Sequence, residues 1–210
     1  MSGILNNILS SLQGLLYSLS ALLITITLHE LAHGYTAYKL GDPTAKAMGR
    51  LTLNPIKHID PIGFLALIIL RFGWAKPVPY NPNYFQNRRK GTFLVALAGP
   101  LTNIILGLAS VIGMTILKFS MSSLYLFFEM MFLYNIAFAV FNLLPIPPLD
   151  GSKILASILP AQLEEIFWKV EKYGHVILLI LLFTRTLNVI LIPIIEVVMI
   201  GMFSLVELFI

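Results

Sequence analysis

The sequence TLHELAHGYTAY, residues 27–38, places His29, Glu30 and His33 in an H-E-x-x-H pattern. From Met1 up to this pattern the chain contains no charged side chain. Residues four apart on an α-helix lie one turn apart on the same face, so both imidazoles can bind one zinc ion. The glutamate between them is then placed to act as a general base toward water. Because about 20 apolar residues cross a bilayer, the pattern predicts a metal site on a membrane-spanning helix.

The composition of the whole chain is that of a membrane protein. Of its 210 residues, 58% are hydrophobic and only 11% are charged, whereas an average soluble domain has about 25% charged residues. We expect an all-α polytopic membrane protein with about five to six transmembrane helices. Residues 1–210 are interpreted as a single integral membrane domain. The chain has no cysteine, so disulfides and thiolate metal ligands are excluded.

Apolar runs and helix-breaking residues divide the chain into segments. We expect a helix over residues 4–39, a half-helix or re-entrant segment over 61–70, spans over 92–117 and 124–144, and a final apolar pair over 173–184 and 186–209. The stretches GRLTLNP and AKPVPYNPNYF have extended character, and we expect them to form a small β-type element at the cytoplasmic side. A substrate strand could add to the edge of this element.

The distribution of charge predicts the orientation. Nine of the fourteen Lys and Arg fall between Lys39 and Lys90, together with only two acidic residues. Cytoplasmic loops are enriched in Lys and Arg, so we expect the N-terminus outside and this loop in the cytoplasm, with the active site toward the cytoplasmic side. The net charge of +4 does not indicate nucleic-acid binding, because no basic helix stands clear of the apolar runs.

A third zinc ligand must come from elsewhere in the chain, because catalytic zinc usually has three protein ligands and one open position. Asp150 is the best candidate. The run from Leu124 to Asp150 is nearly as long as the run from Ile4 to His29, so both groups fall at a similar depth. The prolines of LPIPPLDG break the helix there, and unwound backbone is tolerated at this depth only beside protein or water. A competing interpretation makes Asp150 the N-cap of the following helix.

The cluster has other possible interpretations. The two histidines could simply reach the membrane interface beside a stray Glu, but an uncompensated Glu among apolar residues is costly in lipid. A membrane metal-ion transporter or sensor could use the same His/His/Asp site. Such a protein needs ligands spread across the bilayer and has no need of Glu30. An inactive protease-like scaffold would lack a motif residue, and none is missing.

Three motifs in order resemble those of the site-2 protease family of intramembrane zinc metalloproteases: HELAH, ALAGPLTN (residues 96–103) and NLLPIPPLDG (residues 142–151). The similarity covers roughly residues 20–160. GRLTLNPIKHIDPIG and WAKPVPYNP look like segments of the compact prokaryotic members without PDZ or CBS domains.

The resemblance implies a core of three transmembrane helices and a catalytic core over about residues 4–160, followed by C-terminal helices over about 161–210. It also implies a multi-pass protein in the plasma membrane of a prokaryote, which cleaves transmembrane segments of membrane-protein substrates in regulated intramembrane proteolysis. Carried over onto this sequence, it makes His29, His33 and Asp150 the ligands of one Zn²⁺ and Glu30 the base.

Two asparagines are further candidates. Asn142 matches the Asn of the third motif and could hydrogen-bond a scissile carbonyl or its oxyanion, although a helix–helix hydrogen bond explains it equally well. Asn103 matches the G-x-x-x-N pattern of the middle motif, which begins at Gly99. We consider Asn103 a substrate-binding candidate, with close helix packing at the Gly99–Pro100 pair as the alternative. Asn135 indicates packing only.

Overall fold

The computed structural model describes residues 2–70, 73–117, 123–160, 163–164, 167, 169 and 171–209. Its helices are α1 (Ser2–Lys39), α2 (Thr44–Ala47), η1 (Pro55–Lys57), α3 (Pro61–Leu70), η2 (Pro82–Tyr84), α4 (Arg88–Leu117), α5 (Ser123–Asn142), α6 (Asp150–Ile158), α8 (Gly174–Phe183) and α9 (Thr186–Glu207). No strand occurs among the described residues, so the expected all-α architecture is confirmed.

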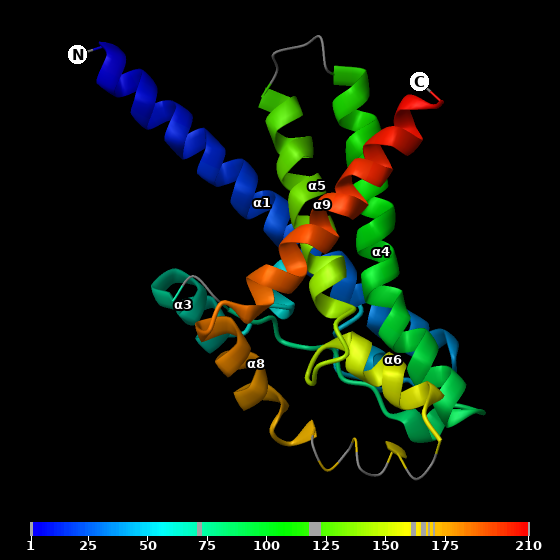
Figure 1. Cartoon of the computed structure of the whole chain (residues 1–210). Coiled ribbons are helices and arrows are strands. Elements are labelled where there is room, and N and C mark those ends of the chain that lie inside the picture. The colour runs from blue at the N-terminus through cyan, green and yellow to red at the C-terminus, as the bar shows by residue number, and fades with distance from the viewer. Residues whose placement is uncertain are drawn as a thin grey trace.

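Four helices, α1, α4, α5 and α9, are long and apolar enough to cross a membrane, and the chain is a multi-pass integral membrane protein. Helices α1, α4 and α5 pack against one another, and α9 crosses α4 and α5 (Figure 1). Fewer helices in the described residues have this length than the five to six expected. The apolar run that starts near residue 173 forms only the ten-residue α8, because Arg185 adopts left-handed backbone geometry (φ 59°) and turns the chain into α9. Ten residues rise only about 15 Å, half of the hydrocarbon thickness.

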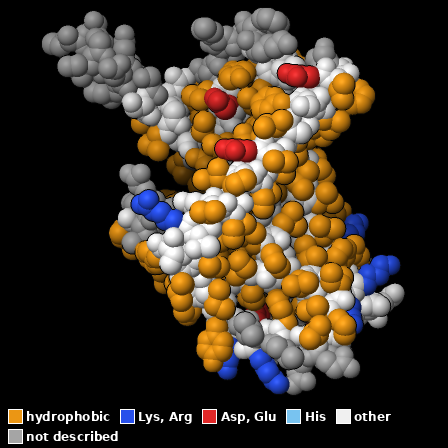
Figure 2. All heavy atoms as spheres, viewed as in Figure 1, with side chains coloured by type: hydrophobic (Ala, Val, Ile, Leu, Met, Phe, Trp, Pro, Cys, Tyr) orange, Lys and Arg blue, Asp and Glu red, His pale blue; other side chains and the backbone are white. Residues whose placement is uncertain are grey.

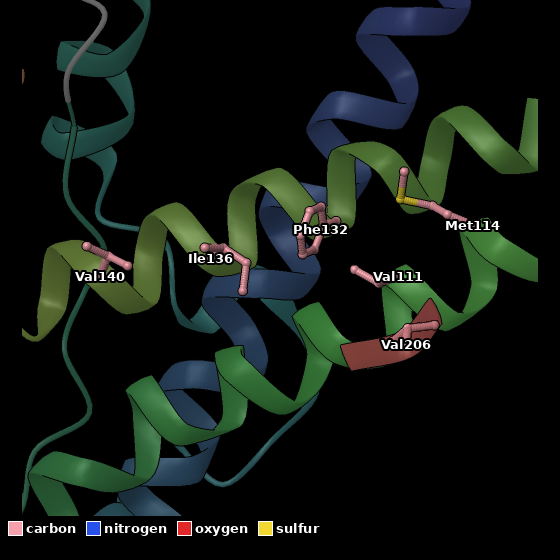
Figure 3. Packing of buried hydrophobic residues seen from close by; sticks show 6 residues of the cluster. All are labelled: Val111, Met114, Phe132, Ile136, Val140 and Val206. Atoms are coloured by element: carbon pink, nitrogen blue, oxygen red, sulfur yellow. The ribbon is translucent and has the colours of Figure 1, made fainter. Parts of the chain in front are cut away.

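The hydrophobic core lies between α4, α5 and α9. Figure 3 shows its buried members: Val111, Met114, Phe132, Ile136, Val140 and Val206. The ring of Phe132 makes an edge contact with Phe203 of α9, with centroids 5.2 Å apart. Gly107 lets α4 approach α5 closely, since a Cβ there would lie 2.5 Å from Cδ1 of Ile136. This packing holds α4 and α5 together, and both helices also pack against α1.

The long connection from α1 to α4 is held by polar contacts. Arg50 donates to the carbonyl of Lys76, and Asp42 accepts the backbone N–H of Asn81. The expected pairing of GRLTLNP with AKPVPYNPNYF is absent from the described residues: Ala75 makes one isolated antiparallel bridge, and its partner is Ile59, which lies outside GRLTLNP. Prolines 77 and 79 lack an N–H, which removes two donors that a ladder over residues 76–80 would need.

Candidate metal centre

Three side chains converge where α1 meets the start of α6. The Nε2 atoms of His29 and His33 are 3.0 Å apart, and they lie 3.1 Å and 3.0 Å from Oδ2 of Asp150. All three residues are buried. This is the one group of three His, Cys, Asp or Glu with metal-binding spacing among the described residues. The helix spacing of the histidines and the break between α5 and α6 together build the cluster.

The hydrogen bonds of the two imidazoles aim their Nε2 atoms at one another. Nδ1 of His33 lies 2.7 Å from the carbonyl oxygen of Val95, and because a carbonyl only accepts, Nδ1 must carry the hydrogen. Nδ1 of His29 pairs with the side-chain oxygen of Asn103. Two nitrogen lone pairs and a carboxylate oxygen at this spacing repel one another unless a proton or a metal cation lies between them.

The donor set fits zinc. Two imidazole nitrogens and one carboxylate are a ligand set of catalytic zinc sites, and bonds of about 2.0–2.2 Å place tetrahedral ligand atoms about 3.3 Å apart. The observed separations of 3.0–3.1 Å are close to that spacing. Each histidine is also oriented through its other ring nitrogen, as metal-ligating histidines are.

Gly99 of α4 faces the donor atoms directly. A Cβ at this position would lie 2.5 Å from Nε2 of His33 and 2.6 Å from Cε1 of His29. Both distances are far inside van der Waals contact. The glycine therefore leaves the room beside the two imidazoles that any larger residue would fill.

Asp150 begins α6, and Leu149 occupies the N-cap position, so the structure does not bear out the N-cap interpretation of Asp150. One turn later, Nζ of Lys153 lies 3.5 Å from Oδ1 of Asp150. Burial alone would raise the pKa of Asp150, but the two imidazoles and Lys153 outweigh it and hold that pKa below its ordinary value. The carboxylate is thus kept in the ionised form that binds metals.

Glu30 is held by the backbone of the loop that covers α1. Its Oε2 accepts the N–H of Val78 at 2.8 Å. Val78 packs tightly on α1 at Gly34, where a Cβ would lie 2.8 Å from Cγ1 of Val78. This contact orients the carboxylate and leaves Oε1 as its second acceptor oxygen.

Asn103 lies behind His29. It is fully buried, and its Nδ2 donates to Oδ1 of Asn135 and to the carbonyl oxygen of Thr25. All of these hydrogen bonds are internal to the protein. Its position therefore favours a role in holding His29 over the substrate-binding role expected from the sequence.

Asn142 lies at the end of α5 and is 8% exposed. Its Nδ2 donates to the carbonyl oxygen of Phe138, one turn back in the same helix. Phe138 in turn makes an edge contact with the His29 ring, with centroids 4.8 Å apart. Asn142 therefore lies on α5 one turn after Phe138, which contacts His29 of the metal centre.

Three features of this site were not predicted from the sequence: the hydrogen bond between Asn135 and Asn103, the Lys153 ammonium group beside Asp150, and the N–H of Val78 that Glu30 accepts. The first had a signal, because a polar amide inside an apolar span needs a partner. The other two depend on how α6 and the loop fold back onto α1, which no local pattern encodes.

Comparisons with known proteins agree with this geometry. Residues 17–126 and 108–184 match Peptidase family M50. The Bacillus subtilis protein named "Putative zinc metalloprotease YwhC" is 42% identical over 176 residues, which cover 80% of each chain. The Mycobacterium tuberculosis protein named "Putative zinc metalloprotease Rip2" is 32% identical over 173 residues, 79% of this chain and 66% of that protein. "Zinc metalloprotease MJ0392" of Methanocaldococcus jannaschii is 27% identical over 73% of this chain and 34% of its own length. No solved structure matches the chain significantly.

Proposed function

The chain belongs to peptidase family M50 and is a zinc metalloprotease, and we propose that it hydrolyses peptide bonds in or next to transmembrane segments of membrane-protein substrates. The observation that supports this most is the position of the site along a membrane-length helix. His29 lies ten residues before Lys39, the last residue of α1, which is about 15 Å along the helix axis. With Lys39 placed at the membrane surface, the site meets peptide bonds that soluble proteases do not reach.

His29, His33 and Asp150 are the proposed ligands of the one Zn²⁺. Zinc bound there supplies Lewis acidity to a scissile carbonyl and to water. The two imidazoles present Nε2 because their Nδ1 atoms are held by Val95 and Asn103. Gly99 keeps the space beside them open.

Glu30 is the proposed general base. The N–H of Val78 holds its Oε2, so Oε1 is the atom that accepts a proton from the attacking water and passes it to the leaving amine. Asn142 is a proposed donor to the oxyanion, because its Nδ2 uses one hydrogen on Phe138 and keeps a second. The proposed role of Asn103 is to hold the His29 ring through its side-chain oxygen.

The orientation and boundaries are also proposals. In Figure 2 the visible Lys and Arg gather mainly at the end of the molecule where α6 lies, whereas the visible acidic groups lie in the opposite half, over α5 and α9. By the positive-inside rule the end near α6 faces the cytoplasm. We place the protein in a prokaryotic plasma membrane, with residues 1–210 as one domain. The transporter alternative has no observation in its favour, because the described residues hold no second group with metal-binding spacing.

The test is to map the cleaved bond. Purified protein in proteoliposomes is given a model substrate with one transmembrane helix, and the products are identified by mass spectrometry. We expect cleavage at bonds within the hydrophobic segment or within a few residues of it. Cleavage confined to a soluble tail of the substrate, far from the membrane, would contradict the proposal.

A further inference from the structure

A line of buried amides runs from α5 to the metal centre. Asn135 and Asn103 have no exposed surface. Nδ2 of Asn135 donates to the carbonyl oxygen of Met131, and Oδ1 of Asn135 accepts from Nδ2 of Asn103, both at 2.8 Å. Oδ1 of Asn103 then pairs with Nδ1 of His29. One end of this line is the backbone carbonyl of Met131, and the other end is the imidazole of His29 in the metal centre.

The hydrogen bonds along this line can be donated in only one direction. Carbonyl oxygens accept and never donate, so Asn135 turns its Nδ2 toward Met131 and its Oδ1 toward Asn103. Asn103 must therefore donate to Oδ1 of Asn135 through its Nδ2. The second hydrogen of that Nδ2 points to the carbonyl oxygen of Thr25. Only the oxygen of Asn103 is left for His29.

The direction of these hydrogen bonds determines the tautomer of His29. An oxygen partner requires that Nδ1 of His29 carries the hydrogen. Nε2 then keeps its lone pair, and it faces His33 and Asp150. If the Asn103 amide turned over, its NH₂ group would meet Nδ1, and the hydrogen of the imidazole would sit on Nε2.

We propose that Asn135 is a positioning residue for the metal centre: it locks the orientation of the Asn103 amide and so keeps His29 in the tautomer that binds zinc. This inference rests on the proposed function, because it takes His29 as a zinc ligand. Partners that orient zinc-ligating histidines change metal affinity by about 10–100-fold. Because Asn135 acts through Asn103, a loss of about tenfold is expected.

The experiment measures zinc affinity of the full chain in detergent by competition with a chromophoric chelator. Asn135→Leu removes both hydrogen bonds and keeps the number and branching of the side-chain heavy atoms. Asn135→Asp keeps an oxygen that accepts from Asn103. Ser110→Ala is the matched control, because Ser110 is also buried in the bundle and donates only to the carbonyl of Leu106 in its own helix. Asn135→Ala replaces the Leu variant if that variant does not fold.

The second readout is the ¹⁵N spectrum of histidine-labelled, zinc-free protein, in which His29 is identified by its loss in His29→Gln. The wild type should show His29 with the hydrogen on Nδ1. Asn135→Leu should bind zinc about tenfold more weakly and show the Nε2–H tautomer, while Asn135→Asp and Ser110→Ala stay within about threefold of the wild type.

Wild-type affinity in Asn135→Leu overturns the inference, as does an unchanged His29 tautomer or an equal loss in Asn135→Asp. Failure of the underlying function looks different. In that case the wild type itself binds no zinc, or binds it equally well after His29→Gln.

Discussion

The Nε2 atom of His29 lies 3.1 Å from Oδ2 of Asp150, a residue 121 positions further along the chain. The contact joins α1, ten residues before its end at Lys39, to the first residue of α6. Since Nδ1 of His29 already pairs with Asn103, the contact brings a lone pair and a carboxylate together. In the proposed site, a zinc ion bound at this contact ties α6 to α1.

Zinc should accordingly stabilise the folded protein. Free zinc at 100 times its Kd adds about 2.7 kcal/mol to the free energy of unfolding, so chelation should lower the midpoint of thermal unfolding. Asp150→Ala should unfold at the same temperature with and without zinc. A zinc-dependent shift of wild-type size in that variant would show that the ion binds elsewhere.

Gly99→Ala should abolish zinc binding. The new methyl group would meet Nε2 of His33 at 2.5 Å, so the ring would have to shift from the position in which Val95 holds it. We expect zinc affinity to fall by at least about 100-fold, measured by chelator competition. Gly201→Ala is the matched control, because no heavy atom lies within 4 Å of a Cβ there. Wild-type zinc content in Gly99→Ala would contradict the geometry of the site.

The loop that carries Val78 should depend on Asp42. This buried carboxylate uses Oδ1 for the N–H of Thr44 and Oδ2 for that of Asn81. Asp42→Asn loses one acceptor and should lower the free energy of unfolding by about 1–3 kcal/mol.

Asp60→Asn is the control for that variant. Asp60 accepts from both Ile62 and Gly63 through Oδ1 alone, and Asn caps helices as well as Asp. Its effect on the free energy of unfolding should be within about 0.5 kcal/mol. Equal effects of the two substitutions would mean that Asp42 does not anchor the loop.

The proposed orientation can be measured by labelling, because the chain has no native cysteine. Lys57→Cys lies in the loop between α1 and α4, and Glu207→Cys lies at the end of α9. A membrane-impermeant maleimide applied to intact spheroplasts should label only the Glu207→Cys protein, and lysis should expose both. Labelling of Lys57→Cys before lysis would reverse the orientation.

The part of the site that sequence could predict is the part built on local geometry. His29, Glu30 and His33 follow from the periodicity of one helix, and Asp150 follows from matching the lengths of two membrane runs. The structure brings these ligand candidates together. Prolines before Asp150 also predicted correctly where α5 would end.

The features that escaped prediction depend on contacts between distant elements. Nothing local indicates that Val78 donates to Glu30, and a buried amide such as Asn135 signals that it needs a partner without showing that the partner is Asn103. The break between the last two apolar segments was predicted at residues 184–186, and it lies there, with Arg185 in left-handed geometry between α8 and α9. No strand forms over residues 76–80, where Pro77 and Pro79 lack the N–H groups that pairing needs.

The most direct test of the account is Glu30→Gln, assayed for zinc content and for cleavage of a transmembrane substrate in the same preparation. Gln keeps an oxygen for the N–H of Val78, but it cannot take a proton from water. The account predicts one zinc ion per chain, as in the wild type, with turnover reduced by at least about 100-fold. Glu30→Gln protein that retains zinc and cleaves at the wild-type rate would contradict it.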